Sequence, residues 1–196
     1  MIENRLFVLV LQHPQEQRQA LSTAGEIAAA LAHAKITVGL SWPNLARARG
    51  RAADPRRWAV LYLGSARPTA ERAAERAAER AIIAVDRRGE AIAGAAGLLR
   101  GLDGIVLLDG TWSQAKNLWW RNPWLLKLHR LVLNPPQPAR YGKIRREPRR
   151  EALSTIEAAA LVLRDAEAKP AAADALLAAL DRMIAPDLVA GRLSVP

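Results

Sequence analysis

The sequence predicts an α/β fold in which a largely parallel sheet is flanked by helices. Short apolar runs typical of buried strands alternate along the chain with helix-forming segments. No stretch of linker composition divides the 196 residues. We therefore expect a single domain over residues 1–196, with its core at about residues 6–163 and a C-terminal helix at residues 171–184.

The expected strands are short and apolar. The segment Leu6–Leu11 (LFVLVL) is one of them, and a Gln-His-Pro sequence ends it. The run from Gly104 to Leu108 stops at the pair Asp109-Gly110, which is typical of a tight turn. The remaining expected strands cover residues 36–40, 58–63 and 131–133.

Three helix starts carry the spacing of a capping box, in which Ser or Thr is followed three residues later by Glu or Gln. The pairs are Thr23 with Glu26, Thr111 with Gln114, and Ser154 with Glu157. They predict helices at residues 27–31, 113–120 and 154–163. A repeat of alanine, glutamate and arginine predicts a further, solvated helix at residues 70–81.

The composition excludes several classes of site. The chain has no cysteine, so it forms no disulfide and offers no thiolate for catalysis or metal binding. Its three histidines, His13, His33 and His129, are too few for a His-rich metal centre. No apolar run is long enough to span a membrane, and the N-terminus lacks the pattern of a signal peptide. We expect a cytoplasmic protein without a metal site.

The charge indicates a polyanionic partner. The formal net charge is +10, the sequence pI is about 11.1, and arginine greatly outnumbers lysine. Genomic base composition is the alternative source of this arginine excess. Basic residues cluster at residues 44–57, expected as a loop or short helix, and at residues 140–150, expected as a loop.

The segment from Leu107 to Lys116 is the strongest candidate for a functional site. It places Asp109, Thr111 and Trp112 at the carboxyl end of an expected buried strand, where open α/β sheets bind ligands. The tryptophan is suited to stacking on a flat ring. The alternative is structural, because Asp is common in turns beside helix N-termini. Trp112, Trp119, Trp120 and Trp124 are mostly expected to pack in the core or against a partner, and Trp119 and Trp120 are given no chemical role.

Two further segments admit both a functional and a structural interpretation. The basic segment 140–150 leads into the capping box at Ser154, as either an anion-binding loop at a helix N-terminus or a solvated loop before an ordinary cap. His13 ends the first expected strand at the same sheet edge as Asp109, and a lone histidine is more often structural. The chain contains no P-loop, no GxGxxG and no Ser-His-Asp arrangement.

Four ordered motifs resemble the DTW-domain family of tRNA-uridine aminocarboxypropyltransferases. They are Gln12-His13-Pro14-x-Glu16 with Ser22-Thr23-x-Gly25, Leu108-Asp109-Gly110-Thr111-Trp112, Tyr141-x-x-Ile144-Arg145, and Leu153-Ser154-Thr155-x-Glu157-Ala158. The resemblance spans roughly residues 6–163. Many members also carry a cysteine-rich, zinc-binding segment near the N-terminus, and this chain has no cysteine.

The resemblance implies an enzyme that transfers the 3-amino-3-carboxypropyl group of S-adenosylmethionine to N3 of a uridine in tRNA, releasing methylthioadenosine. It also implies a SPOUT-like sheet with a C-terminal knotted, cofactor-binding region. Uridine N3 must lose a proton to react, and Asp109 can take that proton or position the base. The methionine carboxylate needs a cation or helix amides, for which Arg145 and the Ser154–Thr155 turn are candidates.

Site residues follow from the motifs. Asp109, Thr111 and Trp112 are expected to be catalytic. Cofactor contacts are expected from Leu108, Gly110, Tyr141, Ile144, Arg145, Ser154, Thr155 and Glu157. Contacts with tRNA are expected from His13, Lys116, Arg140, Lys143, Arg146 and Arg149. Two other functions stay open: a SPOUT-type RNA methyltransferase that uses a similar pocket, and an RNA-binding protein without catalysis.

Overall fold

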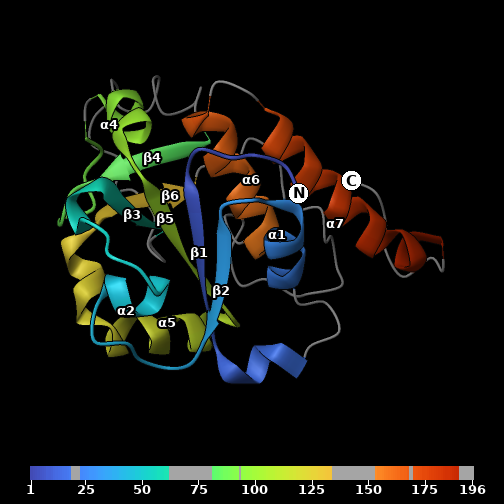
Figure 1. Ribbon diagram of the computed structural model, residues 1–196, viewed down its shortest axis with the longest axis horizontal. Coiled ribbons are helices and arrows are strands. Elements are labelled where there is room, and N and C mark those ends of the chain that lie inside the picture. Colours follow the sequence, from blue (N-terminus) through green and yellow to red (C-terminus); the bar gives the residue numbers. More distant parts are fainter. Residues whose placement is uncertain (19–22, 62–80, 93, 134–152, 168–169, 190–196) are drawn as a thin grey trace.

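The computed structural model describes residues 1–18, 23–61, 81–92, 94–133, 153–167 and 170–189. Within them one six-stranded sheet has helices on both faces (Figure 1). The strands are β1 (Phe7–Gln12), β2 (Ala34–Val38), β3 (Trp58–Leu61), β4 (Ile82–Val85), β5 (Gly104–Asp109) and β6 (His129–Leu133). The α-helices are α1 (Ala24–Ala30), α2 (Leu45–Arg49), α4 (Ala95–Gly101), α5 (Trp112–Arg121), α6 (Thr155–Ala166) and α7 (Ala171–Val189). Three 3-10 helices are η1 (Pro14–Arg18), η2 (Pro55–Arg57) and η3 (Pro123–Lys127).

The strand order is β2-β1-β5-β3-β6-β4. Every neighbouring pair is parallel except β4 with β6, which is antiparallel at the edge of the sheet. Parallel neighbours need crossover connections, and these place helices on the faces of the sheet. The predicted α/β class with a largely parallel sheet is therefore confirmed.

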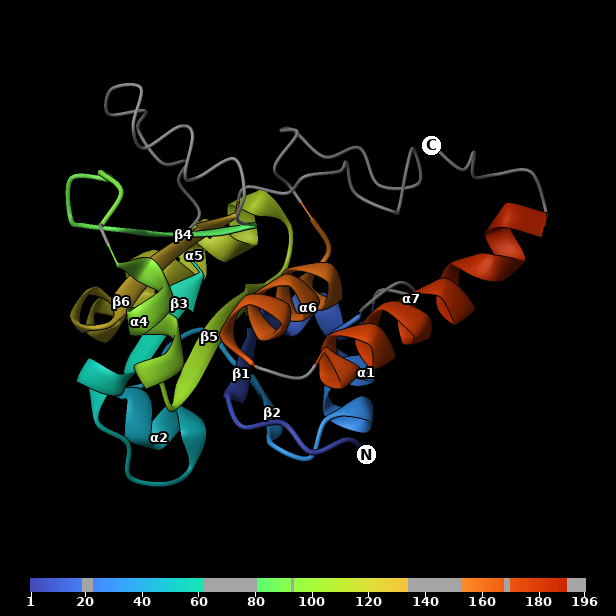
Figure 2. The same cartoon turned by 90° about the horizontal axis from the view of Figure 1, so that it is seen from above.

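Residues along each central strand alternate between two cores. In β1, Val8 and Val10 face one core, which they share with α1, α4, α6 and α7. Leu9 and Leu11 face the other core, which also contains residues of α2 and η3. Figures 1 and 2 show α1, α6 and α7 on one side of the sheet and α2 on the other. The sheet is thus buried on both faces, which explains its nearly continuous apolar strands.

A glycine makes room for the ring of Trp58 in the second core. Gly104 begins β5 and pairs with Phe7 of β1 on one side and Trp58 of β3 on the other. The two ring centroids lie 5.8 Å apart, and a Cβ on Gly104 would come within 2.6 Å of the indole. The Arg49 guanidinium covers both rings, at 4.8 Å from the Phe7 centroid and 5.4 Å from that of Trp58.

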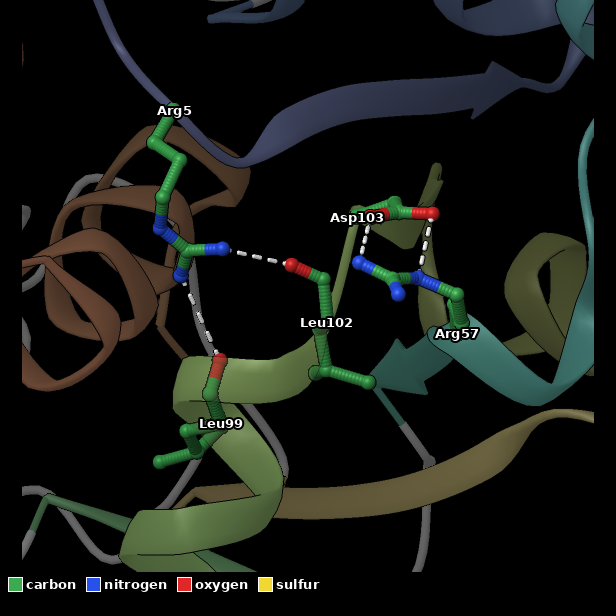
Figure 3. Close-up of polar contacts among 5 residues, drawn as sticks. All are labelled: Arg5, Arg57, Leu99, Leu102 and Asp103. Atoms are coloured by element: carbon green, nitrogen blue, oxygen red, sulfur yellow. Dashed lines mark hydrogen bonds and ion pairs between the residues drawn. The ribbon is translucent and has the colours of Figure 1, made fainter.

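Two arginines form polar contacts at the amino ends of the strands (Figure 3). Arg5 donates to the carbonyl oxygens of Leu102 at 2.6 Å and Ala166 at 3.1 Å, so it joins the segment before β1 to the ends of α4 and α6. Arg57 forms a bidentate ion pair with Asp103, with N–O distances of 2.6 and 2.8 Å. These contacts lie at the edge of the sheet opposite to Asp109, the last residue of β5.

Most expected elements are present, and the structure adds one strand, one α-helix and the 3-10 helices η1 and η3. The five predicted strands correspond to β1, β2, β3, β5 and β6, and the basic stretch 44–57 contains α2 and η2. The sequence analysis missed β4 and α4. The four residues of β4 are too few for a clear periodic pattern, and their antiparallel partner β6 is distant in sequence.

One predicted capping box is wrong. Thr23 does precede α1, but its backbone is helical (φ −86°, ψ −7°), and its side chain makes no capping hydrogen bond. A capping side chain needs a non-helical backbone at the N-cap, which Thr111 and Ser154 have in the two boxes that are confirmed. The expected helix at residues 70–81 falls almost entirely outside the described residues, and the expected loop at residues 140–150 falls wholly outside them. The expected knot stays a prediction.

Candidate active site

The carboxyl ends of β1 and β5 form the point where the chain reverses its direction of winding. The two strands are neighbours, with Gln12 paired to Asp109 at their last residues. After β1 the chain enters α1 on one face, and after β5 it enters α5, whose Trp119 packs in the core of the other face. Figure 1 shows both strands ending near the start of α5. Adjacent helices that leave to opposite faces open a crevice, and ligands bind there in α/β sheets.

Asp109 is the centre of this site. Its side chain is 4 % exposed, and both carboxylate oxygens accept hydrogen bonds. Gln12 donates from Nε2 to Oδ2 at 2.8 Å, and the Thr155 hydroxyl donates to Oδ1 at 2.5 Å. The Asp109 side chain lies on the same face of β5 as Ile105 and Leu107, toward α6. The contacts therefore join β1, β5 and the first residue of α6.

Both hydrogen-bond partners of Asp109 are neutral. Among the described residues no lysine or arginine forms an ion pair with its carboxylate. The first turn of α6 lies beside it, where the amide groups at a helix N-terminus favour a negative charge. The site therefore has an anionic group that is buried, fixed in direction and available to a cationic ligand.

The turn between β5 and α5 depends on Gly110. Its φ is +153°, and a Cβ there would lie 2.9 Å from Gln114 and 3.4 Å from the Cβ of His13. Thr111 then caps α5 in a complete capping box with Gln114. The Gln114 side chain also donates to Gln15 at 3.1 Å, so η1 is tied to the start of α5. Gly110 and Gln114 thereby fix the chain on both sides of Thr111.

His13 lies directly after β1, beside Asp109. It is buried, its backbone N–H donates to the Asp109 carbonyl oxygen at 3.0 Å, and its Nδ1 accepts from the Gln15 N–H. The contact of His13 with tRNA stays a prediction, and the burial of His13 leaves little of its surface for such a contact. Lys116 is exposed, and its ammonium lies 5.5 Å from the ring centroid of the half-buried Trp112. Lys116 thus lies on the exposed surface of α5, next to Trp112.

The second capping box also lies in the site. Ser154 caps α6, and Glu157 accepts from the Ser154 N–H at 3.1 Å and from its hydroxyl at 2.7 Å. Leu108 points to the opposite face from Asp109 and packs in the second core. Hence Thr155 meets Asp109 directly, whereas Ser154 and Glu157 shape the helix start and Leu108 supports the strand.

The remaining expected site residues lie outside the described residues. They are Arg140, Tyr141, Lys143, Ile144, Arg145, Arg146 and Arg149. The described parts of the chain contain no group of three or more side chains that could hold a metal ion. None of the helices described is long and apolar enough to cross a membrane.

Two polar residues of the site were not assigned a role from the sequence. Gln12 orients Asp109, and Glu16 is a carboxylate in η1 that is 1 % exposed. The signal for Gln12 is a polar residue at the last position of a buried strand, opposite another such residue. The signal for Glu16 is weak, because an acidic residue in a short polar segment is usually exposed.

Comparison with known proteins gives one family match and one partial relative. The model of the family described as "DTW domain" matches residues 1–187. A stretch of 59 residues is 41 % identical to tRNA-uridine aminocarboxypropyltransferase 2 of Mus musculus. That stretch covers 30 % of this chain and 20 % of the mouse protein. No solved structure matches the chain significantly.

Proposed function

Because the chain belongs to the DTW-domain family, we propose that it transfers the 3-amino-3-carboxypropyl group of S-adenosylmethionine to N3 of a uridine in tRNA. The name of the partial mouse relative supports this reaction. The observation that carries the proposal is the meeting of three sequence motifs at Asp109. Gln12, Asp109 and Thr155 come from motifs far apart in the chain, and direct hydrogen bonds join them.

The donor groups of the site fit S-adenosylmethionine, which has a sulfonium cation, an ammonium group and a carboxylate. The buried Asp109 carboxylate has only neutral partners among the described residues, which suits a positively charged ligand. The N-terminus of α6 at Ser154 and Thr155, where backbone N–H groups favour a negative charge, suits the carboxylate. Arg145 is the cation we propose for the same carboxylate.

When bound, S-adenosylmethionine supplies the carbon next to the sulfonium, which bonds to N3 as the carbon–sulfur bond breaks and its electron pair leaves on methylthioadenosine. Asp109 receives the N3 proton in this proposal. Gln12 and Thr155 hold both carboxylate oxygens in place and leave further lone pairs to accept it. The uridine must leave any base stack to expose N3, and Trp112 provides a ring on which it can stack.

We further propose that the C-terminal part of the fold is a knotted, SPOUT-like region that binds the cofactor, with Tyr141 and Ile144 as contacts. The parallel strand β6 ends at Leu133, and α6 begins beside Asp109. The described residues on both sides of Tyr141 and Ile144 in the chain are therefore at the carboxyl edge of the sheet. We propose the cytoplasm as the location of the enzyme, since a chain without cysteine suits a reducing compartment.

Nucleoside mass spectrometry of bulk tRNA from a strain that lacks the gene tests the function. The account predicts that aminocarboxypropyluridine disappears, that the wild-type gene restores it, and that Asp109→Asn does not. Loss of a methylated nucleoside would instead identify a methyltransferase. An unchanged nucleoside profile, together with tRNA binding but no heat of binding for S-adenosylmethionine in calorimetry, would identify a non-catalytic RNA-binding protein.

A further inference from the structure

Trp120 is the most exposed large aromatic side chain of the described residues. It is 78 % exposed, whereas Ala115 and Leu118 on the same helix are buried. A helix turns 100° per residue, so Trp120 lies on the side of α5 that faces away from these two residues. A tryptophan in water leaves a large apolar surface unburied, and such surfaces often mark binding sites.

Trp120 lies in a row that starts at the candidate active site. Trp112, Lys116 and Trp120 are spaced at i, i+4 and i+8, so they follow one another along α5 over about 12 Å. The Lys116 ammonium is already stacked at 5.5 Å from the centroid of Trp112. The row alternates aromatic rings with a cation, which is the composition of surfaces that bind unpaired nucleotides.

The helical layer that carries this row is basic. We call residues 44–57 and 112–127, which form α2, η2, α5 and η3, the basic layer. Its only acidic residue is Asp54. Its basic residues are Arg47, Arg49, Arg51, Arg56, Arg57, Lys116, Arg121 and Lys127. Of these, Arg57 is paired with Asp103 and Arg49 is stacked on two rings. The other six are exposed, and two of them also make contacts on α5: Lys116 with Trp112, and Arg121 with Asn117.

The layer on the opposite face of the sheet has the opposite balance. We call residues 24–30, 95–101, 155–167 and 171–185, in α1, α4, α6 and α7, the acidic layer. It carries Glu26, Glu157, Asp165, Glu167, Asp174 and Asp181 against Arg100, Arg164 and Arg182. An excess of arginine from genomic base composition would spread over both layers. The segregation of charge therefore points to a ligand of the basic layer.

The basic surface continues past α5 into a groove. The groove measures about 440 Å³ and lies where η3 meets the start of β6. The polar lining consists of one acidic residue, Asp86, and of Arg56, Arg87, Lys127, His129 and Arg130, beside the exposed Leu126. A polyanion that follows α5 away from the active site would reach these cations next.

We infer that the basic layer is the docking surface for the tRNA substrate, and that Trp120 stacks on a nucleotide near the target uridine. This inference rests on the proposed function, because it takes tRNA as the substrate. The exposed cations contact phosphates, and the ring of Trp120 supplies a contact that salt does not screen. A symmetric dimer through the same face would oppose like charges, because a two-fold interface brings one patch against itself.

Binding of an unmodified tRNA transcript, measured by fluorescence anisotropy over a salt series, tests the inference. Trp120→Ala should weaken binding about 5- to 150-fold and leave the salt slope unchanged, and Trp120→Phe should retain most of the affinity. Lys127→Glu should weaken binding and reduce the salt slope. Arg182→Glu is the matched control, because it changes the net charge equally on the acidic layer, and it should bind nearly as the wild type does. Circular dichroism should show that all four variants are folded.

Several outcomes would contradict the inference. Equal effects of Lys127→Glu and Arg182→Glu would mean that only net charge matters. Wild-type affinity in Trp120→Ala would remove the stacking contact, and a changed oligomeric state in sedimentation would make the face an interface between copies of the chain. Turnover measurements separate this inference from the proposed function. Trp120→Ala should keep the wild-type kcat at saturating tRNA and should raise the KM for tRNA. If the wild type shows no turnover but still binds tRNA through the basic layer, only the proposed reaction is refuted.

Discussion

Thr155 donates a hydrogen bond of 2.5 Å to Asp109, although 46 residues separate the two in the chain. The contact joins the first residue of α6 to the last residue of β5. It lies at the switch point of the sheet, beside Gln12 at the end of β1. The proposed chemistry depends on this contact, because it fixes the direction of the carboxylate that we propose as the base.

Asp109→Asn should lower turnover by at least about 100-fold, the usual scale for loss of a general base. The fold should survive, because the amide keeps the shape of the carboxylate and the Gln12 amide can turn to accept from it. Single-turnover kinetics with unmodified tRNA measures the effect. Asp181→Asn, on the exposed side of α7, is the control and should keep full turnover. Near-normal turnover of Asp109→Asn would leave Asp109 a purely structural residue.

Thr155→Val should lower kcat about 10- to 100-fold, since it removes one hydrogen bond to a charged group and keeps the shape of the side chain. Thr155→Ser should restore turnover because it restores the hydroxyl. The measurement is kcat and KM for both substrates, alongside thermal unfolding. A loss of stability with an unchanged kcat would assign Thr155 to the packing of α6 alone.

Gly104→Ala should destabilise the protein by about 1–3 kcal/mol, the usual cost of overpacking a core. The new Cβ would lie 2.6 Å from the indole of Trp58, which is itself confined by Phe7 and Arg49. Urea unfolding measures the change. Gly97→Ala in α4 is the control, because its Cβ meets nothing within 4 Å, and it should be neutral or stabilising. Equal stability of the two variants would contradict this packing.

The contribution of the turn after β4 to the stability of the protein should depend on pH. Backbone N–H donation from Glu90, and from Arg88 and Gly89, holds the pKa of the exposed Asp86 below its usual value of 3.8. The folded protein then binds its proton less readily than the unfolded chain. The stabilisation is present above pH 3.8 and is lost as the pH falls through the lowered pKa. The stability difference between wild type and Asp86→Asn should therefore shrink at low pH, and a constant difference would refute it.

The sequence predicted those parts of the fold that local patterns determine. The apolar runs of β1 and β5 and the capping boxes at Thr111 and Ser154 each rest on neighbouring residues, and all four are confirmed. Thr23 has the same spacing, but the path of the chain gives it a helical backbone and prevents the cap. The four residues of β4 form a strand because β6 pairs with them, and a local pattern does not contain that information.

The sequence predicted only part of the candidate site, because local patterns determine only part of it. The position of Asp109 follows from one strand and one turn, so the sequence indicated it. The contacts from Gln12 and Thr155 arise from strand order and from the placement of α6, which no local pattern specifies. The segregation of charge between the two layers also appears only after folding, because the acidic segments lie both before and after the basic segments along the chain.

The central claim is the reaction itself, and the by-product of the cofactor tests it most directly. Purified protein, S-adenosylmethionine and unmodified tRNA are incubated, and the small molecules are separated by chromatography. The account predicts methylthioadenosine in an amount equal to the modified uridine formed, and none when tRNA is left out. Release of S-adenosylhomocysteine would contradict the account, because it would show that the methyl group is transferred instead.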